Sequence, residues 1–147
     1  MSILSKLPER LKEELFEKEF STAEFAEKIG VKRHTVTQYL QGVRLPKFHT
    51  FVAMLDLFHC SADFLLGRSE NPDYERAYLP TPPFCERLRV ILAECNLSQY
   101  ALQKRTGLSW NNFHFWLNGK RSPSPELLEK IADALDVSVD YLLGRVK

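Results

Sequence analysis

Hydrophobic and polar positions follow helical spacing along most of this chain. In residues 10–20, RLKEELFEKEF, we place Leu11, Leu15 and Phe16 on one apolar stripe and the acidic side chains on the solvent side. A second stripe at four-residue spacing occurs in PELLEKIADAL and consists of Leu127, Ile131 and Leu135. The pattern predicts short helices and no strand.

Residues with strong local preferences mark where these helices begin and end. Serine is a good N-cap, and glycine readily takes the left-handed conformation that ends a helix. The predicted N-caps are Ser21, Ser61, Ser98 and Ser138, and the predicted helix ends are Gly30, Gly42, Gly107 and Gly119. Pro46 and Pro123 each lie in the loop that follows the third helix, and Asp63 and Asp140 suit the start of the last one.

The chain repeats itself at an offset of 77 residues. Residues 10–68 align with residues 87–145 without a gap, and 17 of these 59 positions are identical. The order of elements therefore predicts two copies of one all-α fold with five short helices each, in residues 1–68 and 84–147. Residues 69–83 between them contain four prolines and are expected to form an extended, fairly stiff linker.

Composition narrows the class of protein. The 147 residues are 44% hydrophobic and 27% charged, as in ordinary globular domains, and contain neither a membrane-spanning apolar run nor a signal-peptide pattern, so we expect a cytoplasmic protein with no membrane partner. Cys60, Cys85 and Cys95 form no metal-binding or disulfide pattern. No catalytic motif occurs either, which favours a non-enzyme without a cofactor.

Charge is segregated although the net charge is only +1. Residues 28–49 contain five Lys or Arg and residues 104–125 contain four, and neither segment contains an acid. Such segments give a small protein local positive faces.

The repeated motif is S-x(8)-G-[VL]-x(8)-L-x-G-x-R-x-P followed by S-x-D-x-L-L-G, and it occurs twice without gaps. It resembles the Cro/phage-repressor (Xre) type of helix-turn-helix family, here in two tandem copies. The resemblance implies two lambda-repressor-like five-helix DNA-binding domains, in which the third helix of each enters the major groove. The function it implies is a sequence-specific, repressor-like regulator that binds double-stranded DNA.

In the first copy, a helical wheel over residues 33–41 places Val36, Tyr39 and Leu40 inward and the polar residues outward. By resemblance, the base-reading positions are Thr22, Arg33, His34, Thr37 and Gln38. The phosphate-contacting positions are Lys32, Thr35, Gln41, Arg44 and Lys47.

The second copy departs from this pattern, because Trp110 and Phe115 stand where Arg33 and Gln38 stand in the first. The same wheel places Phe113, Trp116 and Leu117 in the core. Its base-reading candidates are Gln99, Asn111 and His114, and its phosphate candidates are Asn118, Lys120 and Arg121. Gln103 in place of the small Ala26 predicts looser packing between the second and third helices.

Three uses of the Trp110 and Phe115 face stay open at this point: DNA contact, a surface for a protein partner or a homodimer, or stacking on unpaired bases. If this face docks a protein and the first copy has little DNA affinity, the chain is instead a protein-binding adaptor or antagonist.

Overall fold

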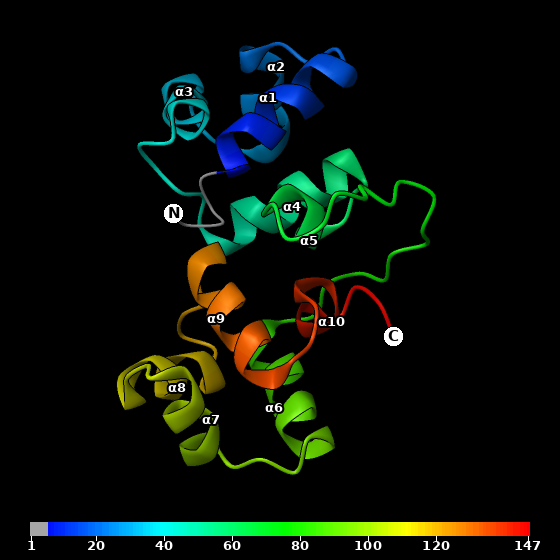
Figure 1. Cartoon of the computed structure of the whole chain (residues 1–147). Helices are drawn as coiled ribbons and strands as arrows, with labels where there is room; N and C mark the ends of the chain where they lie inside the picture. Colours follow the sequence, from blue (N-terminus) through cyan, green and yellow to red (C-terminus); the bar gives the residue numbers. More distant parts are fainter. Residues whose placement is uncertain (1–5) are drawn as a thin grey trace. The chain divides into compact units, whose positions relative to one another are not determined.

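The computed structural model describes residues 6–147, and these form ten α-helices and no strand (Figure 1). They divide into two compact units, Met1–Arg76 (unit 1) and Ala77–Lys147 (unit 2), with five helices each. The helices of unit 1 are α1 (Leu7–Glu17), α2 (Thr22–Ile29), α3 (Arg33–Gln41), α4 (Phe48–Phe58) and α5 (Ala62–Leu65). Those of unit 2 are α6 (Phe84–Glu94), α7 (Gln99–Thr106), α8 (Trp110–Leu117), α9 (Pro125–Leu135) and α10 (Val139–Leu143).

The predicted helix caps are present. The Ser21 side chain accepts a hydrogen bond from the Glu24 N–H while Glu24 accepts one from the Ser21 N–H, which forms a complete capping box at α2. α5, α7 and α10 are capped by Ser61, Ser98 and Ser138, whose side chains each accept a hydrogen bond from the backbone N–H three residues later. Gly30 and Gly107 end α2 and α7 in the left-handed region, with φ of 76° and 71°.

Each unit has its own aromatic core. In unit 1 the rings of Phe25 in α2 and Phe58 in α4 stack with centroids 5.3 Å apart, and both side chains are buried. In unit 2 the ring of Trp116 lies edge-on to those of Phe84 and Phe113, at 6.3 and 5.0 Å. The prediction that Phe113 and Trp116 are core residues is confirmed.

The repeat also preserves a polar contact between the first and last helices of each unit. In unit 1, Arg10 donates a hydrogen bond to the carbonyl of Phe64, and in unit 2 Arg87 donates to the carbonyl of Tyr141. Each of these carbonyls also accepts from a backbone N–H at the end of its helix, that of Gly67 or Gly144, so the arginine adds a second hydrogen bond that ties the first helix to the last.

Two predictions about apolar stripes are wrong in part. Leu11 and Leu15 are buried, but Phe16 is 84% exposed, because the buried face of α1 includes Leu7 and Glu14 in place of Phe16. In α9 only the middle residue of the predicted stripe is fully buried, since the core face is centred on Leu128 and Ile131. The inward side chains Leu40 and Leu117 are half-buried.

The proline-containing segment 69–83 has no helix, and parts of it are held against the units by tertiary contacts. On the unit 1 side, the Tyr74 hydroxyl donates to Glu14 Oε2 at 2.6 Å. On the unit 2 side, the Leu79 N–H donates to the Arg145 carbonyl at 2.8 Å, and the Arg145 guanidinium lies 4.1 Å from the ring centroid of Tyr78. Side chains along this segment therefore belong to the packing of each unit.

Within residues 6–147, no helix is long and apolar enough to cross a membrane.

Candidate nucleic-acid interface

In unit 1, α2 and α3 meet at a tight turn that buries one face of α3. Gly30 ends α2, the Val31 N–H bonds back to the Ala26 carbonyl at 3.0 Å, and α3 begins three residues after Gly30. Ala26 is 3% exposed, and Val36 and Tyr39 of α3 are 0% and 4% exposed. A small side chain at Ala26 lets the two helices approach closely, so the opposite face of α3 is left for solvent.

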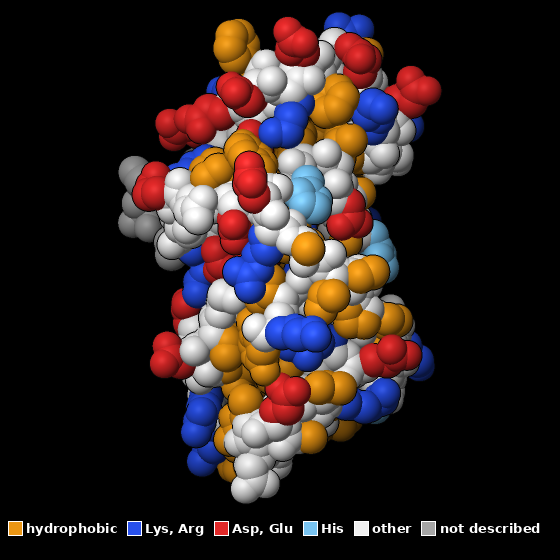
Figure 2. Space-filling model, turned by 90° about the vertical axis from the view of Figure 1, so that its right-hand side faces the viewer, with side chains coloured by type: hydrophobic (Ala, Val, Ile, Leu, Met, Phe, Trp, Pro, Cys, Tyr) orange, Lys and Arg blue, Asp and Glu red, His pale blue; other side chains and the backbone are white. Residues whose placement is uncertain are grey.

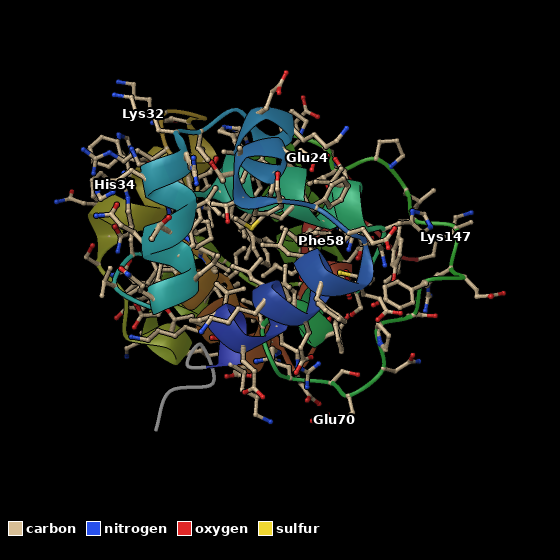
Figure 3. All side chains as sticks on the ribbon, turned by 90° about the horizontal axis from the view of Figure 1, so that it is seen from above. Glu24, Lys32, His34, Phe58, Glu70 and Lys147 are labelled. Atoms are coloured by element: carbon tan, nitrogen blue, oxygen red, sulfur yellow. The ribbon has the colours of Figure 1, made fainter. Side chains whose placement is uncertain are left out.

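The outer face of α3 carries the predicted base-reading residues of the first copy. Arg33 and His34 are exposed, and Thr37 and Gln38 are half-buried. His34 and the neighbouring Lys32 point away from the helices of unit 1 (Figure 3). The Thr37 hydroxyl donates to the Arg33 carbonyl at 3.3 Å, and the lone pairs of its oxygen stay available to accept a hydrogen bond.

The first residue of α2 lies close to the start of α3. Thr22 and Arg33 line one open hollow together with Lys12, Leu15 and Leu40. The structure therefore brings Thr22 close to Arg33, one of the α3 residues that the resemblance assigns to base reading, although a helix and a turn separate them in the sequence.

The basic candidates of unit 1 surround this face. Lys32, Arg44, Lys47 and Gln41 are exposed, and Thr35 is half-buried. Within residues 6–147, none of these three basic side chains forms an ion pair with an acid. Arg44 instead donates to Gln38 Oε1 at 3.3 Å, which links a phosphate candidate to a base-reading candidate.

The remainder of unit 1 is different in charge pattern. Figure 2 shows the side of unit 1 away from α3, where acidic and basic side chains are interspersed. Lys32, Arg44 and Lys47 form no ion pair with an acid in residues 6–147, so their positive charge is available to a polyanion.

Burial raises the pKa of the Tyr39 hydroxyl, against an opposing effect of Arg44, so this core residue of α3 is neutral at physiological pH.

In unit 2, α7 and α8 hold the equivalent positions with less packing. Leu102 is the one buried residue of α7, where α2 buries Phe25, Ala26 and Ile29. This difference agrees with the looser packing expected from Gln103. Gln99, at the start of α7, is half-buried, and its Nε2 is buried without a hydrogen-bond partner among the described residues.

Aromatic stacking organises the outer face of α8. Trp110 is 52% exposed and stacks on the His114 ring, with centroids 4.5 Å apart and planes at 15°. His114 in turn contacts the Asn118 side-chain nitrogen at 3.2 Å. Asn111 is exposed at the start of the helix. The structure thus joins two base-reading candidates of the second copy into one face with Trp110.

Phe115 and Arg121 form a second contact on this side of unit 2. The Arg121 guanidinium lies 4.6 Å from the Phe115 ring centroid, and Lys120 and Arg121 are both exposed. Reasoning from the sequence assigned these two residues to different roles and missed their pairing. The six-residue separation is the same as that of Gln38 and Arg44, which also contact each other, but this contact too appears only in the structure.

An exposed aromatic residue on α7 was also missed. Tyr100 is 64% exposed, and the Lys104 ammonium lies 5.3 Å from its ring centroid.

In the part of the chain that the structure describes, no group of three His, Cys, Asp or Glu side chains could hold a metal ion.

Comparison with protein families agrees with this geometry. Residues 87–147 match the family of Cro/C1-type helix-turn-helix DNA-binding domains, and residues 11–65 match a helix-turn-helix family. The chain therefore contains two helix-turn-helix domains in tandem, of which the second matches the Cro/C1 type. No match was found among curated proteins or among solved structures.

Proposed function

We propose that this chain is a transcriptional regulator, repressor-like in type, that binds double-stranded DNA at a specific sequence. The observation that supports this most is the outer face of α3, where Arg33, His34 and Gln38 stand among basic residues that have no acidic partner. An exposed third helix of this type suits the major groove in both width and chemistry.

Each side chain has a specific part in the proposal. Arg33 forks onto a guanine edge, and Gln38 donates to and accepts from an adenine edge, with His34, Thr37 and Thr22 completing the base contacts. Lys32, Arg44 and Lys47 neutralise phosphates, and Thr35 and Gln41 donate to them. In the second domain, Gln99, Asn111 and His114 read bases, while Asn118, Lys120 and Arg121 contact phosphates.

The test is fluorescence anisotropy of the full chain with labelled duplex at several salt concentrations. Five basic phosphate contacts, at about 0.9 each, predict a slope of about −4.5 for log K against log salt. The matched control is Lys130→Ala, which removes an exposed lysine of α9 outside both basic segments and should leave the slope unchanged. No affinity for any duplex at low salt would refute the proposal.

In vitro selection of bound duplexes then tests sequence specificity. Because the outer faces of α3 and α8 differ at Arg33/Trp110 and Gln38/Phe115, the selected site should contain two unlike half-sites. A perfectly palindromic consensus would contradict unequal reading by the two domains within one chain.

The second candidate function is a protein-binding adaptor, and the 52% exposure of Trp110 favours it. In that case the aromatic face of unit 2 docks a protein, and duplex binding is weak at every salt concentration. The anisotropy experiment separates the two candidates.

A further inference from the structure

The two units have the same turn after their third helix, and this turn brings an arginine at equivalent positions, Arg44 or Arg121, back against that helix. In unit 1 the Val43 N–H donates to the Gln38 carbonyl at 3.1 Å, and in unit 2 the Lys120 N–H donates to the Phe115 carbonyl at 3.0 Å. Gly42 and Gly119 both have φ of 74°, which a residue with a Cβ rarely adopts. Arg44 and Arg121 follow this turn at equivalent positions, so the backbone delivers both to the same place relative to their helices.

What differs is the way in which each arginine is held. Gln38 accepts a hydrogen bond from Arg44 Nη1, which occupies one donor of that guanidinium. Phe115 offers a ring face to Arg121 at 4.6 Å and accepts nothing from it. Within residues 6–147 the Arg121 guanidinium makes no side-chain hydrogen bond or ion pair, so all five of its N–H donors stay free in one plane.

We infer that Phe115 is a positioning residue for DNA binding, which holds Arg121 as a preordered phosphate contact. Stacking on a ring restrains the long arginine side chain before DNA arrives, so less conformational freedom is lost on binding. The charge remains available, because a ring face neutralises nothing. This inference rests on the proposed function and gives unit 2 a direct part in it.

The same contact argues against the other uses of Phe115. Its ring is half-buried and one face is covered by Arg121, which leaves little apolar area for a protein partner or for an unpaired base. Trp110 stacks on His114 but stays 52% exposed, so it keeps apolar area for a partner that Phe115 does not have. The Phe115 ring thus supports a charged neighbour.

The experiment is a double-mutant cycle on the full chain, with duplex affinity measured by anisotropy across a salt series. Arg121→Ala should lower the affinity and reduce the magnitude of the salt slope by about 0.9, since one phosphate contact is lost. Phe115→Leu should weaken binding about two- to fivefold while the salt slope stays the same, because the charge is still present but no longer held in place. In the Arg121→Ala background, Phe115→Leu should have no further effect.

Two further variants separate positioning from a merely structural role. Phe115→Tyr keeps the ring and should bind as the unmodified chain does. Phe16→Leu is the matched control, because it makes the same change at an 84% exposed ring on α1, outside both sets of base and phosphate candidates, and it should leave the affinity unchanged. The thermal midpoint of tryptophan fluorescence shows whether unit 2 stays folded in each variant.

Specific results would overturn the inference. Additive effects of Phe115→Leu and Arg121→Ala would show that the two residues act independently. A Phe115→Leu variant that loses single-stranded but not duplex affinity would make the ring a base-stacking platform. If the unmodified chain binds no duplex at all, the proposed function fails and this inference with it, whereas duplex binding with an additive cycle overturns the inference alone.

Discussion

Replacing Asp140 by asparagine should destabilise unit 2 selectively. Asp140 Oδ1 accepts from Arg145 Nη1 at 2.7 Å, and the two side chains are 8% and 1% exposed. Asparagine keeps the size and one acceptor oxygen but removes the negative charge. The buried Arg145 guanidinium would then lose the negative charge of Asp140, although its contact with the Tyr78 ring would remain.

The expected loss is large for a small domain. Breaking a buried ion pair on one side costs about 3–5 kcal/mol, and the oxygen that asparagine retains places this case near about 3 kcal/mol. For a domain of this size, each kcal/mol lowers the unfolding midpoint by about 4–8 °C, so we expect a decrease of about 12 °C or more. Burial of the pair, rather than its short distance, sets this magnitude, because exposed pairs contribute little.

The chain contains a natural reporter for the measurement. Both tryptophans, Trp110 and Trp116, lie in α8 of unit 2, and Trp116 is 2% exposed. Tryptophan fluorescence therefore follows the unfolding of unit 2, while far-UV circular dichroism follows both units. The control is Asp136→Asn, an exposed carboxylate at the left-handed C-cap of α9, where asparagine is well tolerated and the midpoint should not move.

The double variant Asp140→Asn/Arg145→Met tests the physical reason. Once the Arg145 charge is also removed, part of the lost stability should return, since the cost comes from a buried positive charge that has lost the negative charge of Asp140. A decrease of less than about 1 kcal/mol in the single variant, or a double variant less stable than either single one, would refute the reasoning.

Three further predictions concern unit 1. Ser21→Ala removes the capping box of α2 and should cost about 1 kcal/mol, seen as an earlier transition in circular dichroism with the tryptophan transition unchanged. Arg33→Ala and Gln38→Ala should each reduce discrimination against a wrong base by about 1–3 kcal/mol, measured by competition between selected and altered duplexes, while Lys130→Ala should have no effect. Burial and the hydrogen bond to Glu14 raise the pKa of Tyr74, so its contribution to stability is complete below the ordinary tyrosine pKa of about 10 and is lost as the pH rises above that value. Tyr74→Phe should therefore flatten the alkaline decrease in the circular dichroism midpoint, and an equally steep decrease in this variant would contradict the assignment.

Much of the fold was predictable because its determinants are local. A serine that caps a helix and a glycine in the left-handed region act through hydrogen bonds within a few residues, so Ser21 and Gly30 indicate the limits of α2 from sequence alone. The constant 77-residue offset of the repeat then predicts Ser98 and Gly107 as the limits of α7. The family relationship of both halves agrees with this reading.

The buried face of α1 was harder to predict because distant residues determine it. Apolar spacing left Phe16 beside Leu15 on the wheel, yet the helix buries Arg10 and Glu14 and exposes Phe16. Arg10 is buried because it reaches the Phe64 carbonyl, 54 residues later, and Glu14 accepts from Tyr74, 60 residues later. Tertiary partners made burial of these polar groups favourable, and no local pattern contains that information.

The outer face of α8 shows the same limit at the candidate site. A helical wheel placed Phe115 toward solvent as an isolated aromatic residue, because a wheel ends where the helix ends. Beyond Leu117 the chain turns at Gly119 and brings Arg121 back over the ring, so the neighbour that decides the role of Phe115 lies outside the helix. The first domain has the same turn and the same arginine, with Gln38 as its support. One backbone arrangement thus delivers a cation to both third helices, and the helix residue beneath it determines whether that cation arrives with a donor already occupied or with all of its donors free.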